Sequence, residues 1–130
     1  MSCVGLVLVS HSKELTQGLQ EILKQVQPHV PVAIAGGTEE GEIGTSSEKI
    51  KNAIESVYSD HGVVIFFDLG SALINTEIAI EWLEGKNKVA IADAPLVEGA
   101  YAAIVESGCG SSLEEVLQAA QEAKTIQKIL

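Results

Sequence analysis

The sequence predicts an α/β fold in which an open, mostly parallel β-sheet carries helices on both faces. Four short apolar runs alternate along the chain with segments whose apolar residues recur at helical spacing. The first and third runs are apolar throughout, as expected of strands that are covered on both faces. Apolar residues make up 46% of the 130 residues, which is enough to build a core for one domain over residues 1–130.

The first two predicted strands enclose a helix. The first strand covers residues 3–9 (CVGLVLV), and residues 15–26 follow as a helix that Pro28 ends. The second strand is shorter, residues 32–35 (VAIA), and a polar, glycine-rich loop follows it as far as Gly44. This β-α-β order is typical of neighbouring parallel strands.

The middle of the chain continues the alternation of helices and strands. Thr45 and Glu48 have the spacing of a capping box, which predicts that the second helix opens at Thr45. Residues 62–67 (GVVIFF) form the third predicted strand, which ends at Asp68. The segment after Asp68 has helical periodicity and predicts the third helix.

The last part of the chain contains one more strand and two helices. Residues 88–92 (KVAIA) form the fourth predicted strand. Pro95 suits the first position of the next helix, where its missing N–H costs nothing, and that helix ends near Gly108. Ser112 and Glu115 have capping-box spacing and predict the start of the last helix.

The charge of the chain excludes some classes of function. The net charge is −10, with 8 basic against 18 acidic residues, and only 4% of the residues are aromatic. This composition provides neither the basic patch nor the stacking surface that nucleic-acid binding requires. No stretch approaches the ~20 apolar residues that span a bilayer, and the first residues lack the features of a signal peptide. We therefore expect a cytoplasmic protein without membrane insertion.

Polar or glycine-rich residues follow all four predicted strands. Ligands of open parallel sheets bind at the carboxyl ends of the strands, where the strand order reverses. His11 and Asp68 stand out there, because a carboxylate that accepts a hydrogen bond from imidazole Nδ1–H leaves Nε2 unprotonated. The alternatives are that His11 is an ordinary hydrogen-bonded residue and that Asp68 only caps the following helix.

Several familiar sites do not fit the sequence. The glycines of residues 36–41 have P-loop spacing, but Glu42 stands where the lysine belongs and would repel phosphate. Neither a dinucleotide-binding G-x-G-x-x-G nor a G-x-S-x-G nucleophile motif is present. His29 and His61 fall in predicted loops, so we expect them to be exposed, and no third ligand accompanies His11 and Asp68 with metal-site spacing. Cys3 and Cys109 are far apart and indicate neither a disulfide framework nor a zinc site. We therefore expect no metal and no bound cofactor.

Four segments together resemble a known family. They are VSHS (9–12), GGTEEGEIGTS (36–46), FFDLGSALINTE (66–77) and DAPLVEGAYAA (93–103). In this order they resemble the DhaM family, the phosphotransferase-system subunits of bacterial dihydroxyacetone kinases, over essentially the whole chain. The resemblance extends more loosely to the IIA domains of mannose-type sugar transporters. The chain departs from those domains at 68–72 (DLGSA), where they carry a longer loop. We expect it to be the short, single-domain form, without the extra carrier domains of larger DhaM proteins.

The resemblance implies a function as a phosphotransferase subunit. His11 matches the phosphoryl-accepting histidine of the family, which takes the group from the phosphohistidine of the carrier protein HPr. The phosphorylated histidine of these proteins then passes the phosphoryl group to ADP, which is held in the nucleotide-binding subunit of the kinase. The resemblance also implies a homodimer with a flavodoxin-like core.

The residues around His11 suit this role. We expect Asp68 to orient the ring, and Ser10 and Ser12 to shape the turn or donate hydrogen bonds. Main-chain N–H groups at helix starts bind phosphate well, and glycines allow close approach of the backbone. The predicted phosphate-binding residues are Ser12, Gly37, Gly44, Thr45, Gly70 and Ser71. The role of Glu98 stays open, because an acid at a helix start is explained by the helix dipole.

Two other functions remain open on the sequence alone. One is a mannose-type IIA component that uses the same histidine chemistry to feed a sugar permease. The other is a non-catalytic binding module with a flavodoxin-like fold, which would not be phosphorylated at all.

Overall fold

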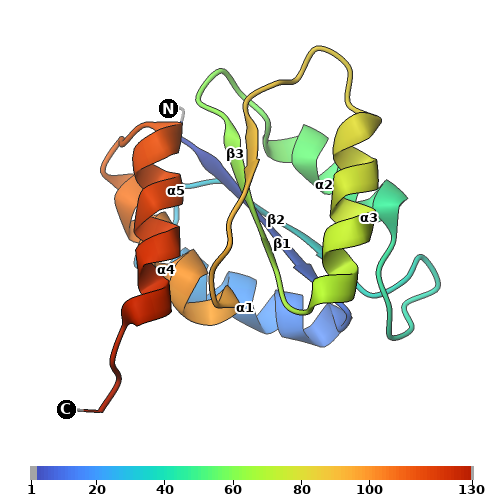
Figure 1. Cartoon of the computed structure of the whole chain (residues 1–130), viewed down its shortest axis with the longest axis horizontal. Helices are drawn as coiled ribbons and strands as arrows, with labels where there is room; N and C mark the ends of the chain where they lie inside the picture. The colour runs from blue at the N-terminus through green and yellow to red at the C-terminus, as the bar shows by residue number, and fades with distance from the viewer. Residues whose placement is uncertain (1–2, 130) are drawn as a thin grey trace.

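The computed structural model describes residues 3–129 and is built on one parallel sheet (Figure 1). Its strands are β1 (Gly5–Ser10), β2 (Val32–Gly36), β3 (Val63–Phe67) and β4 (Val89–Ile91). They lie in the order β2-β1-β3-β4, and every neighbouring pair is parallel. The predicted α/β class with an open parallel sheet is confirmed.

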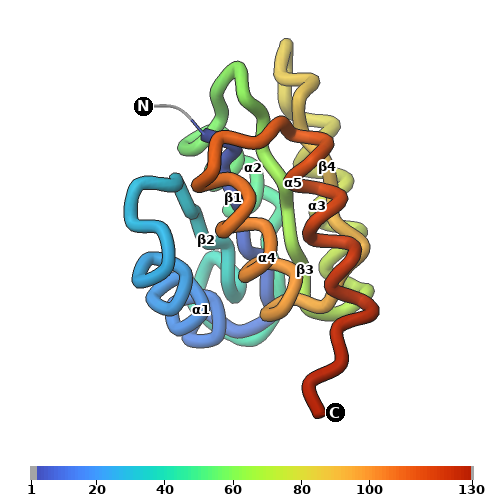
Figure 2. Tube along the Cα trace, turned by 90° about the vertical axis from the view of Figure 1, so that its left-hand side faces the viewer, coloured from blue at the N-terminus to red at the C-terminus, as the bar shows by residue number. Residues whose placement is uncertain are grey.

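Helices cover both faces of the sheet. They are α1 (Lys13–Val26), α2 (Ser47–Val57), α3 (Gly70–Glu81), α4 (Leu96–Gly108) and α5 (Leu113–Glu122), followed by the short 3-10 helix η1 (Ala123–Thr125). Buried residues of α1, α4 and α5 pack in one core layer, and those of α2 and α3 pack in a second layer. Figures 1 and 2 show the two groups of helices with the sheet between them.

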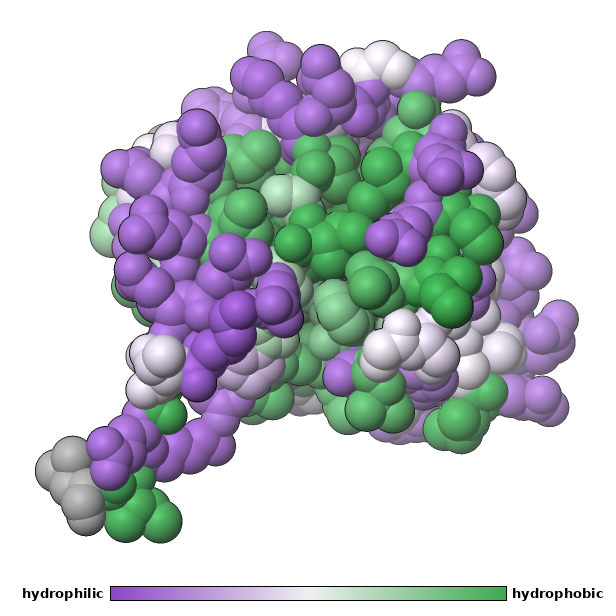
Figure 3. Space-filling model, in the orientation of Figure 1, coloured by the Kyte–Doolittle hydropathy of each residue, from purple (hydrophilic) through white to green (hydrophobic). Residues whose placement is uncertain are grey.

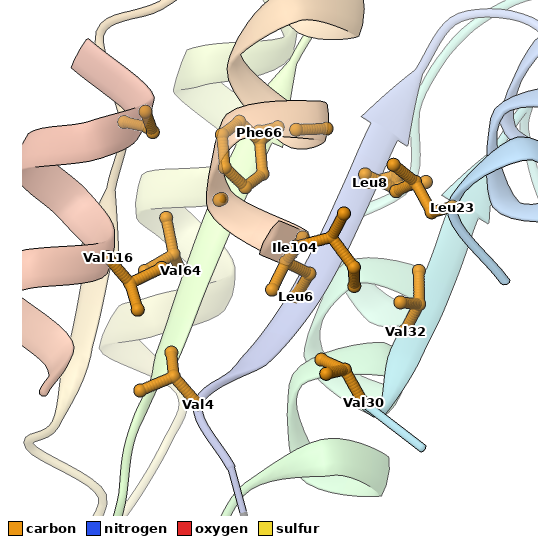
Figure 4. Close-up of a cluster of buried hydrophobic side chains, with 14 of the residues drawn as sticks. Val4, Leu6, Leu8, Leu23, Val30, Val32, Val64, Phe66, Ile104 and Val116 are labelled. Atoms are coloured by element: carbon orange, nitrogen blue, oxygen red, sulfur yellow. The ribbon is translucent and has the colours of Figure 1, made fainter. Parts of the chain in front are cut away.

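The alternation of side chains along β1 divides the core between the two layers. Leu6 and Leu8 point into the layer beneath α1, α4 and α5, shown in Figure 4, and Val7 and Val9 point into the layer beneath α2 and α3. All four side chains are fully buried. An uninterrupted apolar run was therefore the correct signal for a strand that is covered on both faces.

Two predicted helix starts are shifted by one residue. The N-cap of α2 is Ser46, whose Oγ accepts a hydrogen bond from Lys49 N at 3.2 Å, so the predicted capping box at Thr45 is wrong. Pro95 is the N-cap of α4 and not its first helical residue. The capping box of Ser112 and Glu115 is present as predicted.

His29 and His61 are exposed, as predicted. Cys3 is buried and Cys109 is exposed at the end of α4; both are free thiols. Within residues 3–129, no helix is both long and apolar enough to cross a membrane.

Candidate functional site

The site lies where the strand order reverses. From β1 the chain goes to β2 on one side of it and then returns to β3 on the other. The carboxyl ends of β1 and β3 are therefore neighbours in the sheet, and His11 and Asp68 directly follow them. This is the position at which open parallel sheets bind their ligands.

Asp68 holds both the ring and the main chain of His11. Its Oδ1 lies 3.0 Å from His11 Nδ1, and its Oδ2 accepts a hydrogen bond from His11 N at 3.0 Å. The side chains of His11 and Asp68 are 22% and 15% exposed. Because the carboxylate can only accept, Nδ1 carries the ring proton, and the lone pair of the neutral ring is on Nε2.

Two further donors keep Asp68 ionised. Its Oδ2 accepts from Ser10 Oγ at 2.8 Å, and its Oδ1 accepts from Leu69 N at 2.7 Å. Burial raises the pKa of Asp68, but the hydrogen bonds from His11, Ser10 and Leu69 outweigh that effect and hold this pKa below its ordinary value of 3.8. The N-cap of α3 is Leu69, so Asp68 orients His11 and does not cap that helix.

Ser71 faces the other nitrogen of the ring. Its Oγ lies 2.7 Å from His11 Nε2, on the exposed side of the site. Because Nε2 has no proton in this tautomer, the Ser71 hydroxyl donates the bond. The imidazole is thus fixed from both sides, with its lone pair directed at a hydroxyl at the start of α3.

Gly37 and Gly44 stabilise the turn that carries His11. Gly37 N donates to Ser10 O at 3.0 Å, and Gly44 N donates to His11 O at 2.9 Å. Both residues have positive φ, +78° and +142°, in the region that favours glycine. The N–H groups of both glycines are therefore bonded to main-chain carbonyls of the protein, and the two residues support the turn that carries His11.

Of the other predicted phosphate-binding residues, two bind groups within the protein and two lie in the first turn of α3. Ser12 is the N-cap of α1 and accepts from Leu15 N at 3.2 Å, while Thr45 Oγ1 accepts from Asn75 Nδ2 at 2.6 Å. Gly70 and Ser71 occupy the first turn of α3, where main-chain N–H groups have no acceptor within the helix. Of these two residues, Ser71 contacts the ring, through its hydroxyl.

Sequence reasoning did not identify Asn75 and assigned Ser10 only a general role in the turn. Ser10 is completely buried, and its Oγ accepts from Ser12 N at 3.0 Å as well as donating to Asp68. Asn75 lies one turn after Ser71 on α3, and its Oδ1 accepts from Ser47 Oγ at 3.1 Å. Asn75 therefore connects α3 to the start of α2. The spacing of Ser71 and Asn75 by four residues places them on one helix face, but nothing in the sequence reveals their partners.

Glu98 pairs with Lys128, and the hydrogen bond from that ammonium group holds the pKa of Glu98 below its usual range. In the part of the chain that the structure describes, no group of three or more His, Cys, Asp or Glu side chains is arranged to hold a metal ion.

Comparisons with known proteins identify the family. The family model for EIIA-man, described as the PTS system fructose IIA component, matches residues 5–117. The chain is 42% identical over 118 residues to the phosphoryl donor subunit DhaM of PEP-dependent dihydroxyacetone kinase 2 from Listeria innocua, covering 88% of this chain and 94% of that one. It is 38% identical to the phosphotransferase subunit DhaM of Lactococcus lactis, covering 86% and 89% of the two chains.

Solved structures agree with this result. The crystal structure of a protein of unknown function matches with a TM-score of 0.86 and 36% identity, covering 97% of this chain and 98% of that one. The phosphotransferase-system EIIA component of Streptococcus agalactiae shares the fold at a TM-score of 0.66, with 13% identity and coverage of 93% and 92%. The chain belongs to the EIIA-man family and, within it, to the DhaM phosphoryl donor subunits of dihydroxyacetone kinases.

Proposed function

We propose that this chain carries a phosphoryl group on Nε2 of His11, taking it from phosphorylated HPr and passing it to ADP in the nucleotide-binding subunit of a dihydroxyacetone kinase. The observation that carries the proposal is the 3.0 Å contact of Asp68 Oδ1 with His11 Nδ1, which leaves the lone pair on Nε2 at the exposed side of the site. The names of the DhaM relatives, phosphoryl donor subunits, support the direction of transfer.

The transfer to His11 needs no proton acceptor. The lone pair of Nε2 attacks the phosphorus atom of the donor's phosphohistidine, and the donor's N–P bond breaks and returns its electron pair to the donor ring. His11 keeps its proton on Nδ1, so the phosphorylated ring becomes positively charged. The carboxylate of Asp68, 3.0 Å away and kept ionised by its other donors, stabilises that charge.

The start of α3 stabilises the negative charge of the phosphoryl group. The Ser71 hydroxyl gives up its bond to Nε2 when the N–P bond forms, and it is then close enough to donate to a phosphoryl oxygen. The N–H groups of Gly70 and Ser71 and the positive end of the helix dipole act on the same oxygens. Such positioning and charge stabilisation are the main requirements of phosphoryl transfer.

Onward transfer reverses these bonding changes. A β-phosphate oxygen of ADP attacks the phosphorus atom, the His11 N–P bond breaks, and Nε2 recovers its lone pair and its bond to Ser71. The nucleotide belongs to the kinase subunit, so this chain needs no cofactor of its own. The proposal includes a single carrier domain over residues 1–130, a cytoplasmic location shared with HPr, and a homodimeric state.

Reconstitution tests the proposal. The chain is incubated with enzyme I, HPr and phosphoenolpyruvate, and its intact mass is measured. We expect one added phosphoryl group that is acid-labile, absent from His11→Ala and retained in His61→Ala, whose histidine lies in an exposed loop. A folded wild-type protein that stays unmodified would contradict the proposal. The alternative function, a non-catalytic binding module, would then remain.

A second assay separates the kinase from a sugar permease. The phosphorylated chain is mixed with the remaining dihydroxyacetone kinase subunits, ADP and dihydroxyacetone, with no membrane fraction. Formation of dihydroxyacetone phosphate is expected, whereas transfer only in the presence of a permease would identify a transporter component.

A further inference from the structure

Lys49 donates hydrogen bonds to the chain that leaves β2. Its ammonium group lies 2.7 Å from the carbonyl oxygen of Gly36, the last residue of β2, and 3.3 Å from that of Thr38. The side chain is half-buried, and within residues 3–129 it forms no ion pair with a carboxylate. Two of the three N–H donors of this ammonium group are therefore bonded to main-chain carbonyls.

The position of Lys49 in α2 is unfavourable for a cation. The N-cap of the helix is Ser46, and Lys49 is the third helical residue, beside the positive end of the helix dipole. Fixing a long side chain in one conformation also costs entropy. The helix alone therefore does not explain a lysine here, and what the side chain adds to the structure is its pair of hydrogen bonds to the chain after β2.

The first of the two carbonyls belongs to a residue that is packed against the segment after His11. A Cβ atom at Gly36 would lie 2.7 Å from Ser12 O, so the end of β2 touches the backbone there and has no room for a side chain. The next residue, Gly37, donates from its N–H to Ser10 O at 3.0 Å. The end of β2 thus supports the chain both before and after His11.

The second carbonyl belongs to a residue that is packed against Gly44. A Cβ atom at Gly44 would lie 2.7 Å from the methyl carbon of Thr38, and Gly44 N donates to His11 O at 2.9 Å. Thr38 also closes the turn, because its N–H donates to Glu42 O at 2.9 Å and its Oγ1 accepts from Glu42 N at 3.1 Å. Each carbonyl that Lys49 binds therefore belongs to a residue that adjoins a glycine bonded to the main chain on or next to His11.

We propose that Lys49 is a positioning residue for phosphoryl transfer. It ties the loop of residues 36–44 to the start of α2, and this loop fixes the backbone of His11. The ring is thereby kept in its place between Asp68 and Ser71. The inference rests on the proposed function and deepens it, because it adds a residue that acts on His11 through the main chain. Small displacements of a reacting group slow transfer strongly, so such support affects the rate.

The test compares Lys49→Met with Lys49→Arg. Methionine keeps an unbranched side chain but removes the charge and the donors, whereas arginine keeps both. We expect Lys49→Met to lower the maximal rate of phosphorylation by phospho-HPr about 10- to 100-fold and to leave the KM for phospho-HPr unchanged. Because the defect lies at His11, the rate with phosphoramidate, a small donor, should fall by the same factor. Lys49→Arg should recover most of the rate with both donors.

Two further variants serve as matched controls. Lys51→Met removes a lysine of the same helix that pairs with Glu55 at 3.7 Å. Gln20→Ala removes a hydrogen bond of the same kind at the other end of β2, where the side-chain amide donates to Val32 O at 2.9 Å. We expect both variants to be phosphorylated like the wild type, even if Gln20→Ala unfolds at a lower temperature.

A signal of the ring itself distinguishes positioning from general stability. The proton on His11 Nδ1, which faces Asp68 Oδ1 at 3.0 Å, should give a slowly exchanging imidazole N–H signal in ¹H–¹⁵N NMR. We expect this signal to weaken through faster exchange with water in Lys49→Met and to persist in Lys49→Arg and Gln20→Ala. If Lys49→Met does not fold, the same measurements are made on Lys49→Gln, which keeps a polar side chain but loses the charge.

The outcomes separate the positioning role from the carrier function. A folded Lys49→Met or Lys49→Gln that keeps the wild-type rate and the N–H signal would overturn the positioning role. A raised KM for phospho-HPr at an unchanged maximal rate would overturn it as well, because the lysine would then act in binding the donor. A wild-type chain that neither donor phosphorylates would overturn the carrier function, and the N–H signal would still decide whether Lys49 positions the ring.

Discussion

In the proposed function, the contact between Asp68 and His11 serves both the free and the phosphorylated ring. With the proton on Nδ1, the free ring presents a lone pair at Nε2, and we expect the phosphorylated ring to place its positive charge next to the carboxylate, whose Oδ1 lies 3.0 Å from Nδ1. Ser10 and Leu69 hold that carboxylate in place. A hydrogen bond to an ionised carboxylate is stronger than a hydrogen bond between two neutral groups.

The variant Asp68→Asn tests the negative charge of the side chain separately from its size. Asparagine keeps the size of the side chain but loses the negative charge and the control of the tautomer. We expect a folded protein whose phosphorylation by phospho-HPr is slower by about 10- to 100-fold, as when other groups that orient a functional histidine are removed. Asp93→Asn is the control, because Asp93 follows β4 and pairs with Lys124. A wild-type rate in Asp68→Asn would show that the carboxylate only supports the turn.

Asp68 also makes a contribution to stability that depends on pH. Its pKa in the folded protein lies below the ordinary value of 3.8, so the folded state binds the proton less readily than the unfolded state. The stabilisation is therefore present above the unfolded pKa and is lost as the pH falls through the folded one. Urea unfolding should give a difference between wild type and Asp68→Asn that is present at about pH 5 and shrinks below about pH 4. A difference that grows below about pH 4 would contradict this assignment.

Among the elements, α3 connects the His11 ring to the start of α2. Ser71 in its first turn contacts Nε2, and Asn75 one turn later joins α3 to Thr45 and Ser47 at the start of α2. We therefore expect the polar contact of Asn75 with α2 to help hold the Ser71 hydroxyl in place.

Removal of that contact should affect both stability and transfer. Asn75→Ala is expected to lower the free energy of unfolding by about 1–3 kcal/mol, because two partly buried partners lose their hydrogen bonds. It should also slow phosphorylation of His11, since α3 is less firmly held. Glu77→Ala, on the exposed side of α3, should change neither property. Both variants are measured by urea unfolding and by the rate of phosphoryl transfer. A wild-type transfer rate in Asn75→Ala would show that the contact between α3 and α2 does not affect phosphorylation of His11.

The elements also show what the sequence can and cannot predict. That His11 and Asp68 lie together was predictable, because both follow buried parallel strands whose carboxyl ends share one edge of the sheet. The strand order was not predictable, because it depends on packing between distant segments. Gly37 and Gly44 were assigned to phosphate binding, but their N–H groups are bonded to the carbonyls of Ser10 and His11. Local sequence indicates that a backbone approaches closely there, but it does not show which group it approaches.

At the scale of the whole molecule, the edge of the sheet is the surface where we expect two copies to associate. The edge strand β4 is only half-buried; Ile74 of α3 is 62% exposed, and Trp82, the C-cap residue of α3, is 50% exposed. Figure 3 shows apolar surface gathered over the middle of the face where Figure 1 places β4 between α5 and α3. Exposed strand edges and large apolar patches are typical of association surfaces.

We therefore expect the homodimer to form through β4 and α3. Light scattering coupled to gel filtration should give a dimer for the wild type and a monomer after combined Ile74→Ser and Trp82→Ser substitution. Tyr101→Ser on α4, 51% exposed in the wild type, is the control and should stay dimeric. A monomeric wild type, or a double variant that remains dimeric, would exclude this face.

Identification of the phosphorylated atom tests the proposed function most directly. The chain, labelled with ¹⁵N at histidine and phosphorylated by phospho-HPr, is examined by ¹⁵N and ³¹P NMR with His11→Ala as the reference. We expect phosphorus–nitrogen coupling to Nε2 of His11 alone, with Nδ1 protonated and facing Asp68. Phosphorylation of Nδ1, or of a histidine other than His11, would contradict it.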